Sequence, residues 1–287
     1  MPIAAIAFDF DPVLRLADGL AVRWQTVALV AVVAAGLIAT GLIARRNGLR
    51  ADDLLFIAVA VVPGAVVGGR FGYVLLHLDF YAANTTAIAD PGRGSMELAL
   101  AVVGGVLSGA YVASLLGAPI GRWLRSTALP LLFVLGAGKL AMVLGGAGQG
   151  LPSTLPWATA YLGTGPWGSL APDIPSHPSQ AYEGIVTLLI LAALSIGLAV
   201  GAIQPRDGRL FAIAVAGWAV GRVAVSLTWR DEVALVGLSV GGLIAAAVAL
   251  GFLGSLLVFG RRRLGSSEPE SAKREVAWAD PETRPRF

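Results

Sequence analysis

The chain has 287 residues, of which 56% are hydrophobic and 14% are charged, and its formal net charge is +3. Soluble domains carry about 25% charged residues, so this composition excludes an ordinary soluble globular protein. The sequence contains no Cys, which excludes disulfides, thiolate nucleophiles and cysteine metal sites. Because it has two His in all, a histidine metal site is not expected. We therefore expect neither a metal nor another cofactor.

Seven apolar segments follow one another along the chain. Each has about 19 to 25 residues, enough for a helix to cross a hydrocarbon core of about 30 Å. We predict an all-α, polytopic integral membrane protein with seven transmembrane helices. The predicted spans are Leu20–Ala44, Leu54–His77, Met96–Leu116, Ala128–Gly146, Ala181–Ile203, Arg209–Leu227 and Val236–Phe259. We predict one membrane domain over residues 1–263 and a disordered polar tail over residues 264–287.

The orientation follows from the basic residues outside the spans. Fourteen Lys and Arg lie in alternate connections and the C-terminal tail, whereas four lie on the opposite side. Since basic flanks stay cytoplasmic, we expect the N-terminus outside and the C-terminus in the cytoplasm. The connection 147–180 would then lie outside. It contains six Pro and several aromatic residues, so we expect an ordered element on the outer membrane surface.

Three cations remain inside the predicted spans: Arg70, Lys139 and Arg222. Each lies within about two turns of the outer end of its span, and each costs about 2.5–3.5 kcal/mol to insert. Taken singly, each could snorkel to the surface or pair with an acid. Glu97 and Glu183 are the acids at that level, which are too few for three cations. The excess positive charge favours an anion, and a phospholipid phosphate suits arginine.

The stretch from His177 to Glu183 opens the fifth predicted span with an imidazole, an amide, a phenol and a carboxylate. A well-capped helix start would also explain this stretch, but it lies at the level of the three cations. Glycines are frequent near the same level. They favour close helix packing, and they could also thin the wall around a lipid-sized cavity.

These motifs together resemble the prolipoprotein diacylglyceryl transferase family of bacterial inner-membrane enzymes. The resemblance covers about Ala21–Phe259, and the string His-Pro-Ser-Gln-x-Tyr-Glu is its most specific element. The other motifs, in the order of the family, are Arg23-Trp24, Gly68-Gly69-Arg70-Phe71-Gly72-Tyr73, Gly104-Gly105, Gly136-Ala137-Gly138-Lys139-Leu140, Gly150-Leu151-Pro152, Leu155-Pro156-Trp157-Ala158 and Gly221-Arg222.

The resemblance implies transfer of the diacylglyceryl group of phosphatidylglycerol to the thiol of a lipobox cysteine, with release of glycerol 1-phosphate. It implies catalytic roles for Arg222, Lys139 and His177, because cations can hold and polarise the lipid phosphate. The implied substrate-binding residues are Arg70, Tyr73, Gly104, Gly105, Gly150, Gln180, Tyr182 and Glu183. The expected partners are phosphatidylglycerol, the signal peptide of a lipoprotein precursor and the bacterial plasma (inner) membrane, and we expect no nucleic acid.

Several positions depart from the family pattern. Val103 stands where the family has a His that is a candidate to activate the thiol, and Ser226 replaces a Glu. Lys139 replaces the signature arginine, which keeps the charge but loses the two-pronged guanidinium. One alternative is therefore a divergent paralogue that binds anionic phospholipid or a precursor without transfer. A second is a transporter, although the cations share one level and no inverted repeat is evident.

Overall fold

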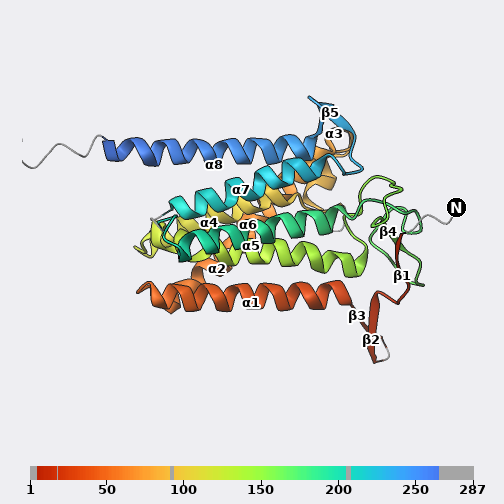
Figure 1. The fold of residues 1–287 in the computed structure, drawn as a ribbon, viewed down its shortest axis with the longest axis horizontal. Helices are drawn as coiled ribbons and strands as arrows, with labels where there is room; N and C mark the ends of the chain where they lie inside the picture. The colour runs from red at the N-terminus through yellow and green to blue at the C-terminus, as the bar shows by residue number, and fades with distance from the viewer. Residues whose placement is uncertain (1–4, 18, 91–93, 205–207, 265–287) are drawn as a thin grey trace, which may run out of the picture.

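The computed structural model describes residues 5–17, 19–90, 94–204 and 208–264. Within these ranges seven helices are long and apolar enough to cross a membrane, which confirms the predicted number. They run side by side in Figure 1. These helices are α1 (Trp24–Arg46), α2 (Ala51–Leu76), α4 (Leu98–Leu115), α5 (Ile120–Met142), α6 (Ser179–Ala199), α7 (Arg209–Ser226) and α8 (Val240–Leu264).

The shorter elements gather at the end of the bundle where α1 begins (Figure 1). The sequence predicted an ordered element in the connection 147–180, which contains one of these strands, but it predicted none of the strands themselves. β1 pairs in parallel with β4, and β2–β3 and β5–β6 are antiparallel hairpins. In the described ranges these elements are β1 (Ile6–Phe8), β2 (Val13–Ala17), β3 (Leu20–Arg23), α3 (Leu78–Ala83), η1 (Thr85–Ala89), η2 (Val143–Gly145), β4 (Thr159–Tyr161), β5 (Val233–Leu235) and β6 (Leu238–Ser239).

Several predicted spans differ from the helices by a few residues at their ends, and the fourth differs most at its start. The sequence placed the start of the fourth span at Ala128, but α5 begins at Ile120, directly after Pro119. Its first turns therefore contain Arg122 and Arg125, which hydropathy alone assigns to a loop. The Nη2 atom of Arg125 donates to the side-chain oxygen of Asn47 at 2.6 Å, so a charged residue at the helix end is accommodated at the surface of the bundle.

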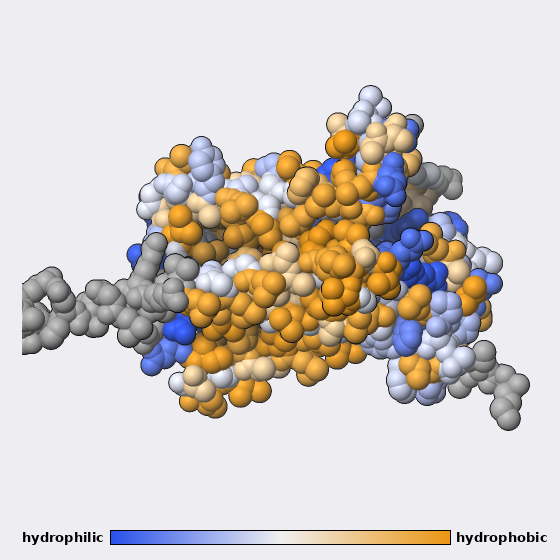
Figure 2. All heavy atoms as spheres, turned by 90° about the horizontal axis from the view of Figure 1, so that it is seen from above, coloured by the Kyte–Doolittle hydropathy of each residue, from blue (hydrophilic) through white to orange (hydrophobic). Residues whose placement is uncertain are grey.

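The helices bury one another around α7, which is the most enclosed of the seven spans. Val215, Trp218 and Ala219 of α7 are almost fully buried in the main apolar core, which α4, α5, α6 and α8 complete. α2 packs instead on α4. The outer surface of the helices forms a broad apolar band, with hydrophilic residues toward both ends (Figure 2). This pattern is that of a helix bundle surrounded by lipid.

The connection 147–180 folds against the N-terminal segment. Phe8 of β1 stacks on Tyr161 of β4 with ring centroids 5.1 Å apart, and Pro152 forms a β-bridge with Ser176. This connection and the N-terminal strands together form a layer, here called the loop layer, across the ends of α5 and α6 (Figure 1). The predicted tail of residues 264–287 lies outside the described residues, except for Leu264, which ends α8.

Candidate active site

A buried ion-pair network joins α4, α6 and α7 beneath the loop layer. Nη1 of Arg222 donates to Oε1 of Glu183 at 2.6 Å, and Nη2 donates to Oε1 of Glu97 at 3.0 Å. The exposed fractions of the three residues are 6%, 2% and 3%. Trp229 covers the guanidinium, with its ring centroid 4.7 Å from Cζ. The two carboxylates thus fix the fork of Arg222 in one orientation.

Lys139 of α5 adds a second cation to this network. Its Nζ lies 2.9 Å from Oε2 of Glu183, and its side chain is 15% exposed. The network therefore contains two cations and two carboxylates, and it has no formal net charge. The sequence predicted an excess of positive charge at this level. In the structure Arg222 and Lys139 are each paired with a carboxylate, so these two cations contribute no excess. One donor remains, since Nε of Arg222 is buried without a hydrogen-bond partner among the described residues.

Glycines bring the helices close enough for these pairs to form. A Cβ at Gly136 of α5 would lie 3.2 Å from the carbonyl oxygen of Gly184 of α6, and a Cβ at Gly184 would lie 2.9 Å from that of Gly136. This contact sets Lys139 beside Glu183. In the same way Gly72 of α2 leaves room for the side chain of Glu97. The close-packing role expected for small residues in membrane helices thus shapes the network.

The guanidinium of Arg70 contacts a different part of the chain, η1 and the residue that follows it. It donates to the carbonyl oxygens of Ile88, Ala87 and Asp90 at 2.7, 2.6 and 3.0 Å. The ring of Tyr73 lies 6.0 Å from its Cζ. Arg70 and Tyr73 therefore form a second group, which holds the connection after α2. Of the three predicted intramembrane cations, Arg222 and Lys139 share the carboxylate of Glu183, whereas these contacts of Arg70 are with backbone carbonyls.

His177 and Tyr182 form a third group at the start of α6. Nδ1 of His177 lies 3.4 Å from the hydroxyl of Tyr182, which also accepts a hydrogen bond from the indole of Trp157 at 2.8 Å. Trp157 is 50% exposed. Through Trp157 this group reaches the surface of the loop layer, and Tyr182 directly precedes Glu183 in α6.

Gln180 and Gly150 fasten the loop layer to the helices. Nε2 of Gln180 donates to the hydroxyl of Tyr161 at 3.0 Å, and burial raises the pKa of Tyr161 to about 12. At Gly150 a Cβ would overlap the hydroxyl of Ser179 and the carbonyl oxygen of Thr228. Both predicted residues thus have defined packing partners. No group of three His, Asp or Glu side chains that could hold a metal occurs in the described part of the chain.

Gly104 and Gly105 lie in the contact between α4 and α2. A Cβ at Gly104 would overlap the carbonyl oxygen of Gly64, which belongs to the backbone of α2. A Cβ at Gly105 would meet the side chain of Val61 at 3.1 Å, and a side chain can move more easily than a backbone. The structure therefore gives Gly104 the stricter packing role of the two.

We expect the substitution Gly104→Ala to lower the free energy of unfolding by about 1–3 kcal/mol, because the helices must separate to admit the methyl group. The matched control is Gly105→Ala, for which the loss should be smaller. Thermal unfolding of both variants in the same detergent measures the difference. Equal stability of the two variants would contradict the assignment of Gly104 to the closest approach of α2 and α4.

Comparison with known proteins adds the family. A sequence model of the family described as prolipoprotein diacylglyceryl transferase matches residues 12–258. The chain belongs to the prolipoprotein diacylglyceryl transferase family. It is similar to the phosphatidylglycerol–prolipoprotein diacylglyceryl transferase of Bordetella avium, with 31% identity over 88% of this chain and 94% of the relative. It is also similar to the same-named protein of Geobacter sulfurreducens, with 28% identity over 89% and 97%.

Within this diacylglyceryl transferase family, the position of Val103 stands out. Val103 lines a cavity of about 640 Å³ between α2, α4, α7 and α8, together with Leu100, Phe211 and Ile244. The lining of this cavity is mostly apolar. No group from this wall replaces the proton-accepting imidazole that the resemblance implies at this position, so a thiol approaching here would meet hydrocarbon side chains.

The sequence did not predict the contacts of three residues in and around the candidate site of this family member. Glu97 was noted as an acid at the right level, but its pairing with Arg222 follows only from the fold. Trp229 covers the guanidinium from just beyond the end of α7. Arg230, counted as a loop residue, donates to the carbonyl oxygen of Gly150 at 2.5 Å and to the hydroxyl of Ser176 at 2.9 Å. Each of these three residues is polar or aromatic and lies close to the end of a predicted span, and this position could have marked them as candidates.

Proposed function

We propose that this chain transfers the diacylglyceryl group of phosphatidylglycerol to the thiol of a lipobox cysteine and releases glycerol 1-phosphate. The protein is a bacterial multi-pass membrane protein of the family whose relatives carry this activity in their names. The observation that carries the proposal is the buried network of Arg222, Lys139, Glu97 and Glu183 at one end of the membrane helices.

The reaction moves one negative charge. The thiol first loses its proton, and the thiolate sulfur then forms a bond to the terminal glycerol carbon of the diacylglyceryl group. The bond between that carbon and the phosphate oxygen breaks, and its electron pair stays on the phosphate. The phosphodiester monoanion thereby becomes a phosphate monoester with a second negative charge, which requires electrostatic stabilisation in the transition state.

We propose that Arg222 and Lys139 supply that stabilisation. Because the network is neutral, we infer that a phosphate is held by those N–H donors of Arg222 and Lys139 that do not already bind a carboxylate. These are Nε of Arg222, which lacks a partner among the described residues, and the remaining ammonium hydrogens of Lys139. Glu97 and Glu183 keep both cations oriented before the substrate arrives, so that little reorganisation is needed during the reaction.

We assign the other predicted residues to the surroundings of the headgroup. His177 and Tyr182 lie at the surface of the loop layer and would contact the glycerol group. Gln180 and Gly150 hold the loop layer in place. Arg70 and Tyr73 hold the connection after α2, and we infer that they support the adjoining wall of the lipid site.

The test uses purified full-length protein, phosphatidylglycerol vesicles and a synthetic lipobox peptide. Mass spectrometry should detect the peptide with a diacylglyceryl group on its cysteine, and glycerol 1-phosphate should be released in equal amount. A peptide with Ser in place of the cysteine and vesicles of phosphatidylethanolamine are the controls. Folded protein that gives neither product in vesicles would overturn the proposal.

Val103 and its apolar wall favour one second function, which is binding of anionic phospholipid or precursor without transfer. The same experiment separates the two. A pure binder would retain phosphatidylglycerol through purification and would bind the peptide, yet the mass of the peptide would stay unchanged over the pH range in which its thiol ionises.

We propose the plasma (inner) membrane as the location, with the loop layer outside and the end of α8 in the cytoplasm. The excess of basic residues at the other end of the bundle supports this orientation. A reporter fused after Arg263 should therefore read cytoplasmic, and one inserted at Ser169 should read extracytoplasmic. Two reporters on the same side would contradict both the orientation and the number of spans.

A further inference from the structure

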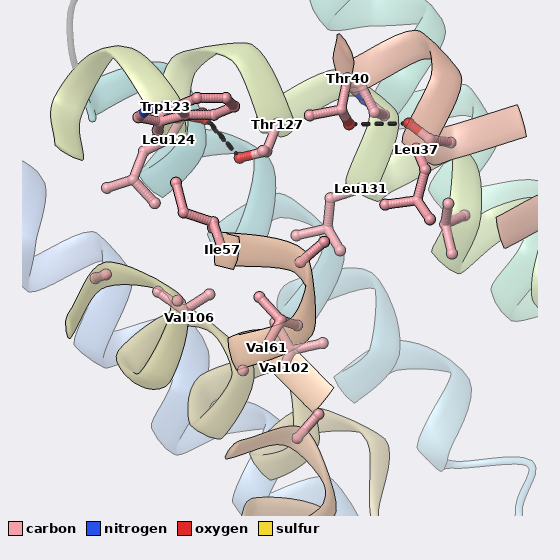
Figure 3. A pocket seen from close by; sticks show the side chains of 18 of the residues that line it. Leu37, Thr40, Ile57, Val61, Val102, Val106, Trp123, Leu124, Thr127 and Leu131 are labelled. Carbon is pink, nitrogen blue, oxygen red and sulfur yellow. Dashed lines mark hydrogen bonds between the residues drawn. The ribbon is translucent and has the colours of Figure 1, made fainter. Parts of the chain in front are cut away.

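A second apolar space lies between α1, α2, α4 and α5, and we call it the α1/α2 groove. Its volume is about 440 Å³, which is within the range of ligand sites in proteins. Leu37, Val61, Val106 and Leu131 come from the four helices and surround this space (Figure 3). Neither Arg222 nor Lys139 lines it. The groove is therefore separate from the ion-pair network of the candidate active site, and Gly105 is the one implied substrate-binding residue that lines it.

The lining of the α1/α2 groove suits a hydrocarbon chain. Its two threonine hydroxyls are already satisfied by their own helices, because Thr40 donates to the carbonyl of Gly36 and Thr127 to those of Trp123 and Leu124. Neither hydroxyl hydrogen is therefore free to bind a polar occupant. In a membrane-spanning layer, an apolar space of this size loses dispersion contacts unless hydrocarbon fills it.

The α1/α2 groove is open on one side and closed at one end. Val33, Leu37 and Val62 line it and are 45%, 46% and 60% exposed, so it opens between α1 and α2 toward the surrounding lipid. At the closed end Trp123 is 3% exposed. It packs in a buried cluster with Ala44. A chain can thus enter sideways and reach Trp123, but lipid outside the groove cannot contact this ring.

Exposed arginines flank the closed end. Arg45 directly follows Ala44, and Arg122 directly precedes Trp123, so each of these two residues of the closing cluster has an exposed arginine as its neighbour in the chain. The indole nitrogen of Trp123 is buried and has no hydrogen-bond partner among the described residues. An anionic phosphate would complement the two arginines, and the ester carbonyl of a phospholipid would supply an acceptor for the indole.

We propose that the α1/α2 groove binds one acyl chain of an anionic phospholipid whose headgroup lies at the end of the bundle marked by Arg45 and Arg122. This is the leaflet opposite the loop layer. The lipid is thus distinct from the phospholipid proposed as substrate, and the site stands whether or not the protein carries out transfer.

The first test measures whether a chain reaches Trp123 in the intact protein. Full-length protein is placed in phosphatidylglycerol vesicles with brominated acyl chains, which quench tryptophan fluorescence on contact. The signal of each ring is taken as the difference between the wild type and a Trp→Phe variant. We expect the Trp123 signal to be quenched and the signal of Trp218, which is 1% exposed and outside the groove, to be unaffected. Equal signals for Trp123 in brominated and ordinary vesicles would overturn the proposal.

The second test fills the groove. Ala58→Leu with Ala110→Leu places bulk in the lining, whereas Ala34→Leu with Ala35→Leu places the same bulk on exposed residues of α1. Native mass spectrometry after detergent exchange should show loss of one retained phospholipid in the filled variant and none in the control. Retention of that lipid in the filled variant would count against the site. Arg222→Ala should leave this lipid bound, which separates it from the substrate.

The third test concerns the headgroup. Arg45→Gln with Arg122→Gln should remove the preference for phosphatidylglycerol over phosphatidylcholine while Trp123 stays quenched by either lipid. An unchanged preference would overturn the assignment of the headgroup to this end. Displacement of the bound lipid by a lipobox peptide would show that the groove instead takes the apolar segment of a precursor, and would also overturn the proposal.

Discussion

Replacing Arg222 with Ala is expected to lower the transfer rate at least about 100-fold and to destabilise the protein by about 3–5 kcal/mol. The rate falls because the leaving phosphate loses its main fixed donor. Stability falls because Glu97 and Glu183, at 3% and 2% exposure, lose the partner that compensates their charges. Product formation measured by mass spectrometry and thermal unfolding in detergent report the two losses separately.

Two further variants separate the chemical role of Arg222 from its structural role. Arg222→Lys keeps the charge but cannot face both carboxylates with a planar fork, so we expect an intermediate rate. Arg222→Met combined with Glu97→Gln removes one charge of each sign and leaves the pair of Lys139 and Glu183 intact. This double variant should be more stable than Arg222→Ala, because it leaves no carboxylate of the Arg222–Glu97 pair buried without a partner for its charge. If it also regained transfer, the role of Arg222 would be structural.

The spans could be predicted from the sequence because each depends on one local property, the length of an apolar run. The start of α5 could not be predicted in this way. Arg122 and Arg125 interrupt the apolar run, yet they lie in the first turns of the helix. Strands of two to five residues such as β4 and β6 are too short to show an alternating pattern, and their pairing depends on contacts between distant segments.

The candidate site shows the same division. The sequence identified Arg222, Lys139 and Glu183 because charges in apolar segments are costly and therefore conspicuous. It could not predict which acid each cation contacts, since the partners are distant in the chain: Arg222 and Glu97 are 125 residues apart. It also placed Arg70 with the other cations from depth alone. Depth along a helix does not fix the direction of a side chain, and the guanidinium of Arg70 contacts the backbone of η1.

The transfer rate of the wild type is expected to rise about 25-fold between pH 7 and pH 9. A cysteine thiol of pKa about 8.5 is roughly 3% ionised at pH 7 and about 76% ionised at pH 9. If no nearby base accepts its proton, the rate follows the thiolate fraction, which increases with pH. Tyr161 does not account for such a rise, because burial raises its pKa to about 12 and it stays protonated through pH 9. Initial rates in a series of buffers at constant ionic strength measure the profile.

Val103 provides the variant that tests this explanation. Val103→His places an imidazole in the wall where the family resemblance implies a thiol-activating group. An imidazole of ordinary pKa, about 6.5, is already neutral and able to accept a proton at pH 7. We therefore expect this variant to be faster than the wild type at pH 7 and similar to it at pH 9, with a flatter profile. Val103→Gln, which is polar but not basic, should keep the steep profile. A wild-type rate that is high and constant from pH 7 to pH 9 would show instead that another residue, with His177 the first candidate, already removes the thiol proton.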